Sequence, residues 1–530
     1  MNKKIIIFFL SWILFSTVYS WLAIYLQELG YLNFDALYIS HQNNLMFNAE
    51  VSKIKTFFLS YPTLPHLLAY PASVFSVIKA PLVTSILITA LFSASIITVI
   101  VDYKLRLFEW IFMVYFLASP IMLYAATSGS SFYAYLIGFY FIYYYLFKYI
   151  QEYTTYRLTI LSLVFGLMVF LNFKMLWLIA LIIPLLFLFS VNLTKTQYTK
   201  LPLQLVAIFQ KKTIRRKFIG IFNSMIMVVG FFPLVTLAIY LLINQLFGSD
   251  PYFFKKSEFL RTQKFSINQF DLATSEISFD LLAQNSYTFL VYVIGLLMLF
   301  FLQYFRNLKN WLLHGLFIST PIFLILALKQ SHIATLNLSY FGLFYGVALA
   351  SIVSYYRGGN HSEEKHQWQW IYLVVLTLSI YGEYHYFKNS IHPSEKEFHQ
   401  ALMNKQPSEF SSGMKEVSFF IKNNINEDSK ILCDNDLFYP VMVLSEKTPS
   451  YFYQLTDTYE AALRYPNLYV DYIIVAHPET FYYRNDKMKA LVTAIHAGNY
   501  NTQLNHKIVF SNSFVQIIKL VRFENYASNE

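Results

Sequence analysis

The stretch "KKIIIFFLSWILFSTVYSWLAIYL", residues 3–26, decides the fold, because one unbroken apolar run follows two lysines. A run of about 20 apolar residues is long enough to cross the hydrocarbon core of a bilayer as one helix. The run is too long for the apolar part of a signal peptide, and no small-residue cleavage site follows it. We therefore predict that it stays in the protein as a membrane-spanning helix.

The same pattern recurs along most of the chain. Of the 530 residues, 56% are hydrophobic and 13% are charged, whereas a soluble domain has about 25% charged residues. The single cysteine, Cys433, excludes an intrachain disulfide. The fold class is therefore a polytopic α-helical membrane protein. We predict eleven spans near residues 4–26, 81–101, 108–126, 131–147, 158–172, 174–190, 218–246, 287–305, 311–328, 336–356 and 369–387.

The formal charge of +10 follows from basic loops rather than from a nucleic-acid surface. Placing all of these loops in the cytoplasm satisfies the positive-inside rule, so the N-terminus is inside and nucleic acid is not an expected partner. Loops 27–80 and 248–286 then lie on the non-cytoplasmic face. We expect an integral membrane protein, with the bacterial inner membrane as its location. The basic segments, on every second connection, are "MNKK" (1–4), "DYKLR" (102–106), "KYIQEYTTYR" (148–157), "KKTIRRK" (211–217), "RNLKN" (306–310) and "YRGGNHSEEK" (356–365).

Residues 388–530 have a different character from residues 1–387, which we assign to the transmembrane domain. Apolar runs shrink to strand length, and helix-like stretches alternate with them, which predicts an extracytoplasmic α/β domain. The last two strands are close enough to form a hairpin. The expected strands are "KILCD" (430–434), "DYIIVA" (471–476), "HKIVFS" (506–511) and "FVQIIKLVRF" (514–523), and the expected helices cover 411–425, 457–465 and 485–498.

Loop 27–80 is predicted to contain two helices that do not span the membrane. Both "FDALYISHQNNLMF" (34–47) and "LPHLLAYPASVFSVI" (64–78) have apolar residues at helical spacing that are interrupted by polar ones. Such helices are typical of the plane of the membrane interface, where they would roof the space above the spans.

This order of parts resembles the GT-C superfamily of integral-membrane glycosyltransferases, which includes protein mannosyltransferases and the aminoarabinose transferases of lipid A. The likeness extends over nearly the whole chain, but its local motifs are short. "YPTLPHLLA" is similar to a His/Tyr-Pro-Pro-Leu segment of that class, and the other matching segments resemble its third and fourth spans, a later outer turn and a strand of its C-terminal domain. These segments are "SPIMLYAATSGSSFYAYLIGFYFIYYYLFKY" (119–149), "LNFKMLWLIALIIPL" (171–185) and "YVDYIIVAHPET" (469–480).

The resemblance implies transfer of a sugar from a polyprenyl-phosphate donor to a glycan, lipid or protein acceptor on the non-cytoplasmic face, usually with inversion. The lipid phosphate is the leaving group, so no nucleotide cofactor is required. Many relatives carry a second acid, often for a divalent metal, in the outer turn between the third and fourth spans. Here that turn reads "ATSGSS" (126–131), which puts a two-carboxylate metal site in doubt.

Asp35 matches the catalytic carboxylate that such relatives carry in the first outer loop. A general base must reach the acceptor hydroxyl directly, and this acid follows the first span closely. The alternative is that Asp35 is the N-cap of the helix that begins with "ALYIS", a frequent position for Asp. Glu50 is a further acid of the same loop and a second candidate for the substrate-binding site.

Several cations and histidines on the same face are candidates for binding the substrates. Lys174, between two apolar runs, matches the cation that relatives hold near the donor phosphate; the alternative is a lysine that snorkels to the interface. The basic-aromatic loop after residue 248 suits either the donor phosphate or anionic lipid headgroups. His66 and His332 are substrate-binding candidates or plain loop histidines. The loop cations concerned are Lys255, Lys256 and Arg261.

Three rival functions stay open at this point. A polymerase or ligase of lipid-linked glycans would share the outer site. A transporter would favour internal repeats and polar residues at the membrane midplane, and neither is evident in the sequence. A non-enzymatic membrane scaffold would use the C-terminal domain to bind a partner, with Asp35 serving only as a helix cap.

Overall fold

The computed structural model describes most of the chain, and it is mostly helical with a small C-terminal sheet. Predicted spans 287–305 and 311–328 lie outside the described residues. The residues described are 3–48, 52–59, 61–101, 107–194, 196, 198, 201–256, 338–357, 369–390, 392–454, 456–480, 483, 486–496 and 505–521.

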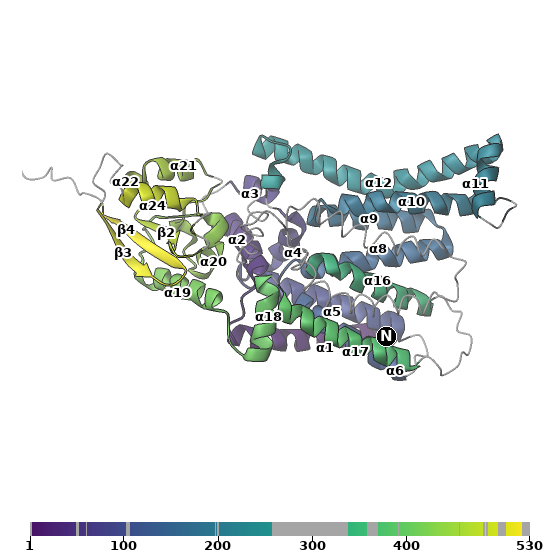
Figure 1. Ribbon diagram of the computed structural model, residues 1–530, viewed down its shortest axis with the longest axis horizontal. Helices are drawn as coiled ribbons and strands as arrows, with labels where there is room; N and C mark the ends of the chain where they lie inside the picture. Colours follow the sequence, from purple (N-terminus) through teal and green to yellow (C-terminus); the bar gives the residue numbers. More distant parts are fainter. Residues whose placement is uncertain are drawn as a thin grey trace, which may run out of the picture.

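A bundle of long helices forms the larger part of the molecule, with the C-terminal sheet beyond one end of it (Figure 1). Helices cover nine of the eleven predicted spans. Most of the buried apolar side chains of the bundle belong to a single core cluster. The bundle helices are α1 (Lys3–Glu28), α5 (Ala80–Ile100), α6 (Leu107–Leu117), α7 (Pro120–Thr127), α8 (Phe132–Glu152), α9 (Thr155–Leu171), α10 (Met175–Leu193), α12 (Lys212–Gly248), α16 (Leu338–Arg357) and α17 (Gln369–Asn389).

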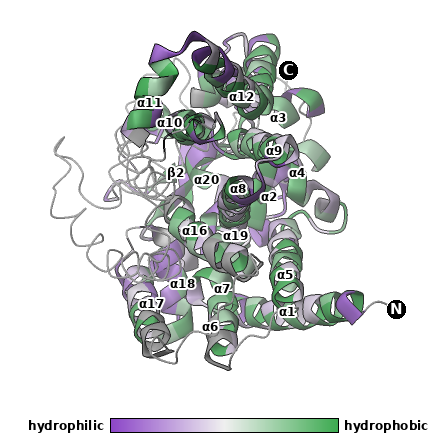
Figure 2. Ribbon diagram, turned by 90° about the vertical axis from the view of Figure 1, so that its right-hand side faces the viewer, coloured by the Kyte–Doolittle hydropathy of each residue, from purple (hydrophilic) through white to green (hydrophobic). Residues whose placement is uncertain are grey.

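Among the described residues, four helices are long and apolar enough to cross a membrane: α1, α5, α10 and α12. Their hydrophobic character is visible along the bundle in Figure 2. Helix α8 is mostly enclosed by its neighbours and rich in tyrosine, and an enclosed helix needs less apolar surface than one that faces lipid. The number of eleven spans therefore stays a prediction.

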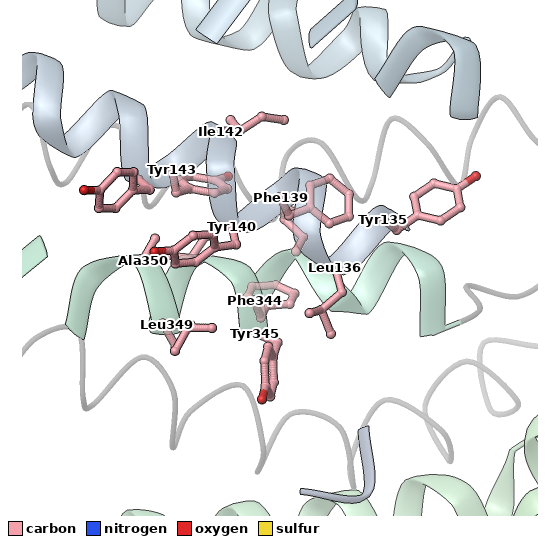
Figure 3. Packing of buried hydrophobic residues seen from close by; sticks show 14 of the residues in the cluster. Tyr135, Leu136, Phe139, Tyr140, Ile142, Tyr143, Phe344, Tyr345, Leu349 and Ala350 are labelled. Atoms are coloured by element: carbon pink, nitrogen blue, oxygen red, sulfur yellow. The ribbon is translucent and has the colours of Figure 1, made fainter. Parts of the chain in front are cut away.

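Helices α8 and α16 pack closely because α16 presents glycine to its partner. A Cβ atom on Gly346 would lie 2.8 Å from the backbone nitrogen of Tyr140, and one on Gly342 would lie 3.0 Å from the ring of Phe132. Glycines four residues apart let two membrane helices approach to backbone contact. The aromatic side chains around this contact, including Phe139 and Tyr345, fill the adjoining core (Figure 3).

The predicted span at 108–126 is two helices instead of one. Helix α6 ends at Leu117 and α7 begins at Pro120, with the Ser119 side chain accepting a hydrogen bond from the Met122 amide. The break leaves amides that the helix cannot satisfy, and inside a membrane protein these need internal partners. Buried Glu383 of α17 supplies one, accepting a hydrogen bond from the Ile121 amide at 3.4 Å.

Helices α2 (Phe34–Asn48), α3 (Lys53–Leu59) and α4 (Thr63–Ser73) lie between the bundle and the C-terminal sheet (Figure 1). The expectation that both predicted helices lie in the interface plane is wrong for α2, which is almost wholly buried. Helix α20 (Asn435–Leu444) packs on it, so α2 is enclosed between two layers of protein. Helix α4 keeps exposed large side chains at Leu67 and Tyr70, as an interfacial helix would.

The C-terminal α/β unit, residues 405–521, has a four-stranded sheet in the order β1-β2-β4-β3. Strands β1 and β2 are parallel, and β3 and β4 form the predicted hairpin. Both faces of the sheet are covered by separate apolar clusters. Its elements are α19 (Glu409–Asn424), β1 (Ile431–Cys433), α20, α21 (Asp457–Arg464), α22 (Pro466–Tyr469), β2 (Tyr472–Ala476), α24 (Met488–His496), β3 (Asn505–Ser511) and β4 (Val515–Val521).

The expected strands and helices of this unit are confirmed. Helix α18 (Pro393–Asn404), which the prediction assigns to the C-terminal domain, packs instead on the bundle: Phe398 and Ala401 belong to the bundle core. It joins the two parts of the chain and contributes residues to the candidate site.

The close approach of α8 and α16 yields a stability prediction. We expect Gly346→Ala to lower the thermal unfolding temperature, because the added methyl group collides with backbone, at a cost of about 1–3 kcal/mol. Gly220→Ala is the matched control, since nothing lies within 4 Å of its Cβ position. There the change removes a helix-interior glycine and is expected to be neutral or slightly stabilising. Equal unfolding temperatures for both purified variants would contradict this packing.

Candidate functional site

The first turn of α2 is capped by Asn33. The side-chain oxygen of Asn33 accepts a hydrogen bond from the Ala36 amide at 3.0 Å, which is the usual N-cap interaction. Asp35 is the second residue of the helix and does not occupy the cap position. The alternative interpretation of Asp35 as the N-cap is therefore wrong, and its carboxylate is left for another role.

A buried network of polar side chains fixes the start of α2. The Asn33 amide nitrogen donates to the hydroxyls of Tyr31 at 3.0 Å and Tyr124 at 3.2 Å. The Tyr31 hydroxyl in turn donates to the backbone oxygen of Ser394, whose own hydroxyl accepts from the Phe34 amide. The helix start is thus held by α7 and α18 together, which positions the neighbouring carboxylate.

Asp35 lies at the rim of this network and is only partly exposed to solvent. No hydrogen bond or ion pair joins its carboxylate to any residue that the structure describes. Burial, and to a smaller extent the charge of nearby Glu395, raise the pKa of this carboxyl from 3.8 to about 6. A carboxylate with a pKa near the working pH, at a place that solvent can reach, is what a general base requires.

The carboxylate of Glu395 joins neighbouring helices through hydrogen bonds. One of its oxygens accepts from the Leu338 amide at 2.9 Å, and the other accepts from the hydroxyls of Tyr386 at 2.7 Å and Ser390 at 2.6 Å. These bonds tie together α16, α17 and α18. Both carboxylate oxygens of Glu395 therefore take part in this structural contact. Across the described ranges, no three His, Cys, Asp or Glu side chains gather as metal ligands.

The outer turn between α7 and α8 packs directly on the first turn of α2. Gly129 there has φ +68°, and a Cβ atom on it would lie 3.1 Å from the Cβ of Ala36 and 3.1 Å from the Leu82 amide nitrogen. The hydroxyls of Ser128 and Ser130, which flank the glycine, are buried and bonded to each other at 2.8 Å. Where many members of the resembled class carry a second acid, this turn has hydroxyls and no carboxylate.

Lys174 lies in the turn between α9 and α10, with 6% of its surface exposed. The Asn172 side chain accepts from the Lys174 amide, and the Phe173 amide donates to the Tyr61 hydroxyl, so this turn is fixed. Burial lowers the pKa of the Lys174 ammonium from 10.5 to about 8. The group therefore remains mostly charged at neutral pH, and its burial contradicts the snorkelling alternative.

An apolar-aromatic cluster connects the Lys174 turn to α2. Phe34 and Tyr38 of α2 share this cluster with Tyr61, and Phe173 packs against it. Phe254 of the short helix η1 (Phe253–Lys256) completes the same cluster. The acid, the lysine and the start of the basic loop thus adjoin one packed unit.

A run of five buried polar residues, Ser40 to Asn44, occupies the middle of α2. The Asn44 side chain donates to Thr448 of the C-terminal unit, and the Asn43 side chain donates to Ser73 of α4 at 2.9 Å. The run therefore bonds both to the neighbouring helix α4 and to the C-terminal unit.

Two buried imidazoles lie beside this run, His41 at 1% exposure and His66 at 2%. Burial lowers the pKa of each histidine to about 3, so both are neutral at ordinary pH. The rings of Tyr439 and Tyr453 lie about 6 Å from that of His41. Within the described parts of the chain, Nε2 of His41 and both ring nitrogens of His66 lack a well-formed hydrogen bond.

No protein-family model matches this chain, and no curated protein sequence matches it. The resemblance to membrane glycosyltransferases therefore rests on the sequence segments quoted above.

The remaining predicted site residues divide into two groups. Lys255 and Lys256 lie in η1, next to Phe254 of the aromatic cluster. Glu50, Arg261 and His332 lie outside the described residues. Of the candidates with a described position, Asp35 belongs to α2 itself, and His66 lies beside Tyr38 of that helix. Lys174 adjoins the aromatic cluster that contains Phe34 and Tyr38.

Sequence reasoning missed most of the polar residues that hold the site together. Asn33 had a recognisable signal, because it stands before the first helical residue, two positions ahead of Asp35. His41 and Asn43 are signalled by the polar run "SHQNN" within an apolar segment. Glu395 gives no such signal, because its carboxylate also binds the amide of Leu338, which is far away in the sequence.

Two substitutions distinguish the contribution of the Asn33 cap to stability from that of the Asp35 carboxylate. The folded-state pKa of Asp35 lies above its ordinary value, so ionising this acid disfavours the fold; the cost is absent below about pH 4 and complete above pH 6. Asp35→Asn should therefore raise the free energy of unfolding at pH 8 by on the order of 1–2 kcal/mol, after discounting for solvent screening. At pH 4 it should change little.

Asn33→Ala should instead destabilise the protein at both pH values by about 1–2 kcal/mol, since it removes a cap. Thermal unfolding of the two purified variants at pH 4 and pH 8 measures both effects. A loss of stability in Asp35→Asn that is equal at both pH values would show that the Asp35 side chain stabilises the fold, which contradicts this prediction.

Proposed function

We propose that this protein is a membrane glycosyltransferase that moves a sugar from a polyprenyl-phosphate donor to an acceptor on the face of the membrane that bears the C-terminal α/β unit. The observation that carries the proposal is the carboxylate of Asp35. It is partly exposed, it does not cap its helix, and its helix start is held by a network of buried side chains.

In this proposal Asp35 takes the proton from the acceptor hydroxyl, or orients that hydroxyl, as the acceptor oxygen attacks the anomeric carbon of the donor. The bond from the sugar to the lipid phosphate breaks at the same time, and the phosphate leaves with its negative charge. Attack from the side opposite the leaving group inverts the configuration at the anomeric carbon. A general base contributes roughly 10²–10⁴-fold to the rate of such a step.

The leaving phosphate needs positive charge that is already in place. Lys174 is buried in a fixed turn that adjoins the aromatic cluster of α2, and the basic loop begins from the same cluster. Preorganised cations at a developing charge stabilise the transition state without further reorganisation. The apolar helices beside this turn provide a surface for the prenyl tail of the donor.

The first test is the activity of Asp35 variants in membranes that contain the polyprenyl-phosphate sugar. We expect Asp35→Asn to lose on the order of 10²-fold or more in transfer rate, because only the proton-accepting charge is removed. Asp35→Glu should also be poor, since a displacement of about 1 Å can cost about 10² in rate. The wild-type rate should rise with pH through about 6, the pKa of the Asp35 carboxyl.

Glu28→Gln is the matched control for this test, since Glu28 is an exposed acid at the end of α1 in the same outer segment. A well-expressed Asp35→Asn protein with full activity would eliminate the proposal. Native mass spectrometry of the purified protein for a bound polyprenyl-phosphate sugar identifies the donor independently of the acceptor.

The second test concerns the lysine. Lys174→Met keeps the apolar stem and removes the charge, so donor KM should rise roughly tenfold or more while folding and membrane insertion are kept. Lys53→Met, at an exposed position of α3, is the control. An unchanged donor KM in Lys174→Met would separate this lysine from the donor phosphate.

A further inference from the structure

Helix α11 (Leu201–Gln210) lies at the end of the bundle farthest from the C-terminal sheet (Figure 1). It connects α10 to α12, and both of these helices are long and apolar enough to cross a membrane. A connection between two such helices lies where they leave the bilayer. Helix α11 is therefore expected at a membrane surface, on the side opposite the candidate site.

One side of α11 is fixed to the protein. Ile208 is fully buried in a small apolar cluster with Val191 of α10 and Phe218 of α12, and Leu205 packs against this cluster. The contact holds the helix in one orientation, so its other side has a defined direction.

The other side of α11 is apolar and exposed. Leu203, Val206 and Phe209 have exposed fractions of 46%, 49% and 59%. Their spacing of three residues places them along one stripe of the helix. Exposed apolar side chains at a membrane surface are favourable when they enter the boundary between headgroups and acyl chains.

Five exposed cations follow this stripe immediately: Lys211, Lys212, Arg215, Arg216 and Lys217. Four of these cations lie in the first two turns of α12. The hydrophilic start of α12 is visible beside α11 in Figure 2. None of the five forms a salt bridge within the part of the chain that the structure describes. No acidic residue occurs between Glu152 and Asp250 to neutralise them locally.

We infer that α11 and the first two turns of α12 form a binding surface for the headgroups of anionic phospholipids. The apolar stripe enters the bilayer boundary, and the cations then lie at the level of the lipid phosphates. The combination is what selects lipid over a soluble polyanion, because a nucleic acid would gain nothing from Leu203, Val206 and Phe209. This surface is independent of the proposed glycosyl transfer, and it lies at the opposite end of the bundle.

The test uses the full-length protein in detergent with an equimolar mixture of phosphatidylglycerol and phosphatidylcholine, read by native mass spectrometry. We expect the wild-type protein to retain phosphatidylglycerol preferentially. A variant with all five cations changed to glutamine should lose this preference by about tenfold or more, because each cation near an anionic surface contributes separately. The matched control is Lys3→Gln with Lys4→Gln, two cations of α1 that adjoin no amphipathic helix.

A second variant, Leu203→Ser with Phe209→Ser, tests the apolar stripe. It should lower the retention of both lipids while keeping their ratio, since the stripe does not distinguish headgroups. Unchanged preference for phosphatidylglycerol in the five-cation variant would overturn the inference. Displacement of the bound phosphatidylglycerol by a short single-stranded oligonucleotide would also overturn it and assign the surface to nucleic acid. The unfolding temperature of each variant shows that the comparison is made on folded protein.

Discussion

The arrangement depends on one constraint: a polar helix is enclosed between an apolar bundle and an α/β layer. Helix α2 carries five consecutive buried polar side chains, Ser40 to Asn44, and leaving a buried polar group unpaired costs about 1–3 kcal/mol. Partners for these groups come from the neighbouring helix α4 and from the C-terminal unit. Asn43 bonds to Ser73 of α4, and Asn44 bonds to Thr448 of the C-terminal unit. The position of α2, and with it that of Asp35, is fixed by these partners.

The local pattern of apolar runs made much of the fold predictable. Apolar runs of span length predicted the bundle helices, and short apolar runs predicted the strands of the C-terminal sheet, because both signals are local. The broken helix at Ala118–Ser119 was not predicted, since continuous hydrophobicity hides a break that depends on Pro120 and on Glu383 of α17. The burial of α2 was also missed, because its composition suits an interface equally well.

The candidate side chains Asp35, Lys174 and His66 were predictable from the sequence, but the contacts that hold them in place were not. Asp35 stands out as a lone carboxylate after a span, but the sequence does not distinguish a helix cap from a base. That distinction came from Asn33, whose side chain takes the cap, and from Tyr31 and Tyr124, which hold Asn33. Contacts of this kind join α2, α7 and α18, and no local pattern specifies them. The sequence likewise gave no reason to expect Glu395 beside Asp35.

Burial, rather than mutual attraction, dominates the electrostatics of Asp35 and Lys174. If Asp35 and Lys174 formed an ion pair, each would favour the charged form of the other, and the two pKa values would move apart. Instead burial is the leading cause at both groups: it raises the pKa of the Asp35 carboxyl and lowers that of the Lys174 ammonium, and neither group contributes to the shift of the other. The enclosed layer thus carries a destabilising charge of each sign at two separate places. Two separate places suit the proposed reaction, in which the acceptor hydroxyl would bind at Asp35 and the donor phosphate would bind at Lys174.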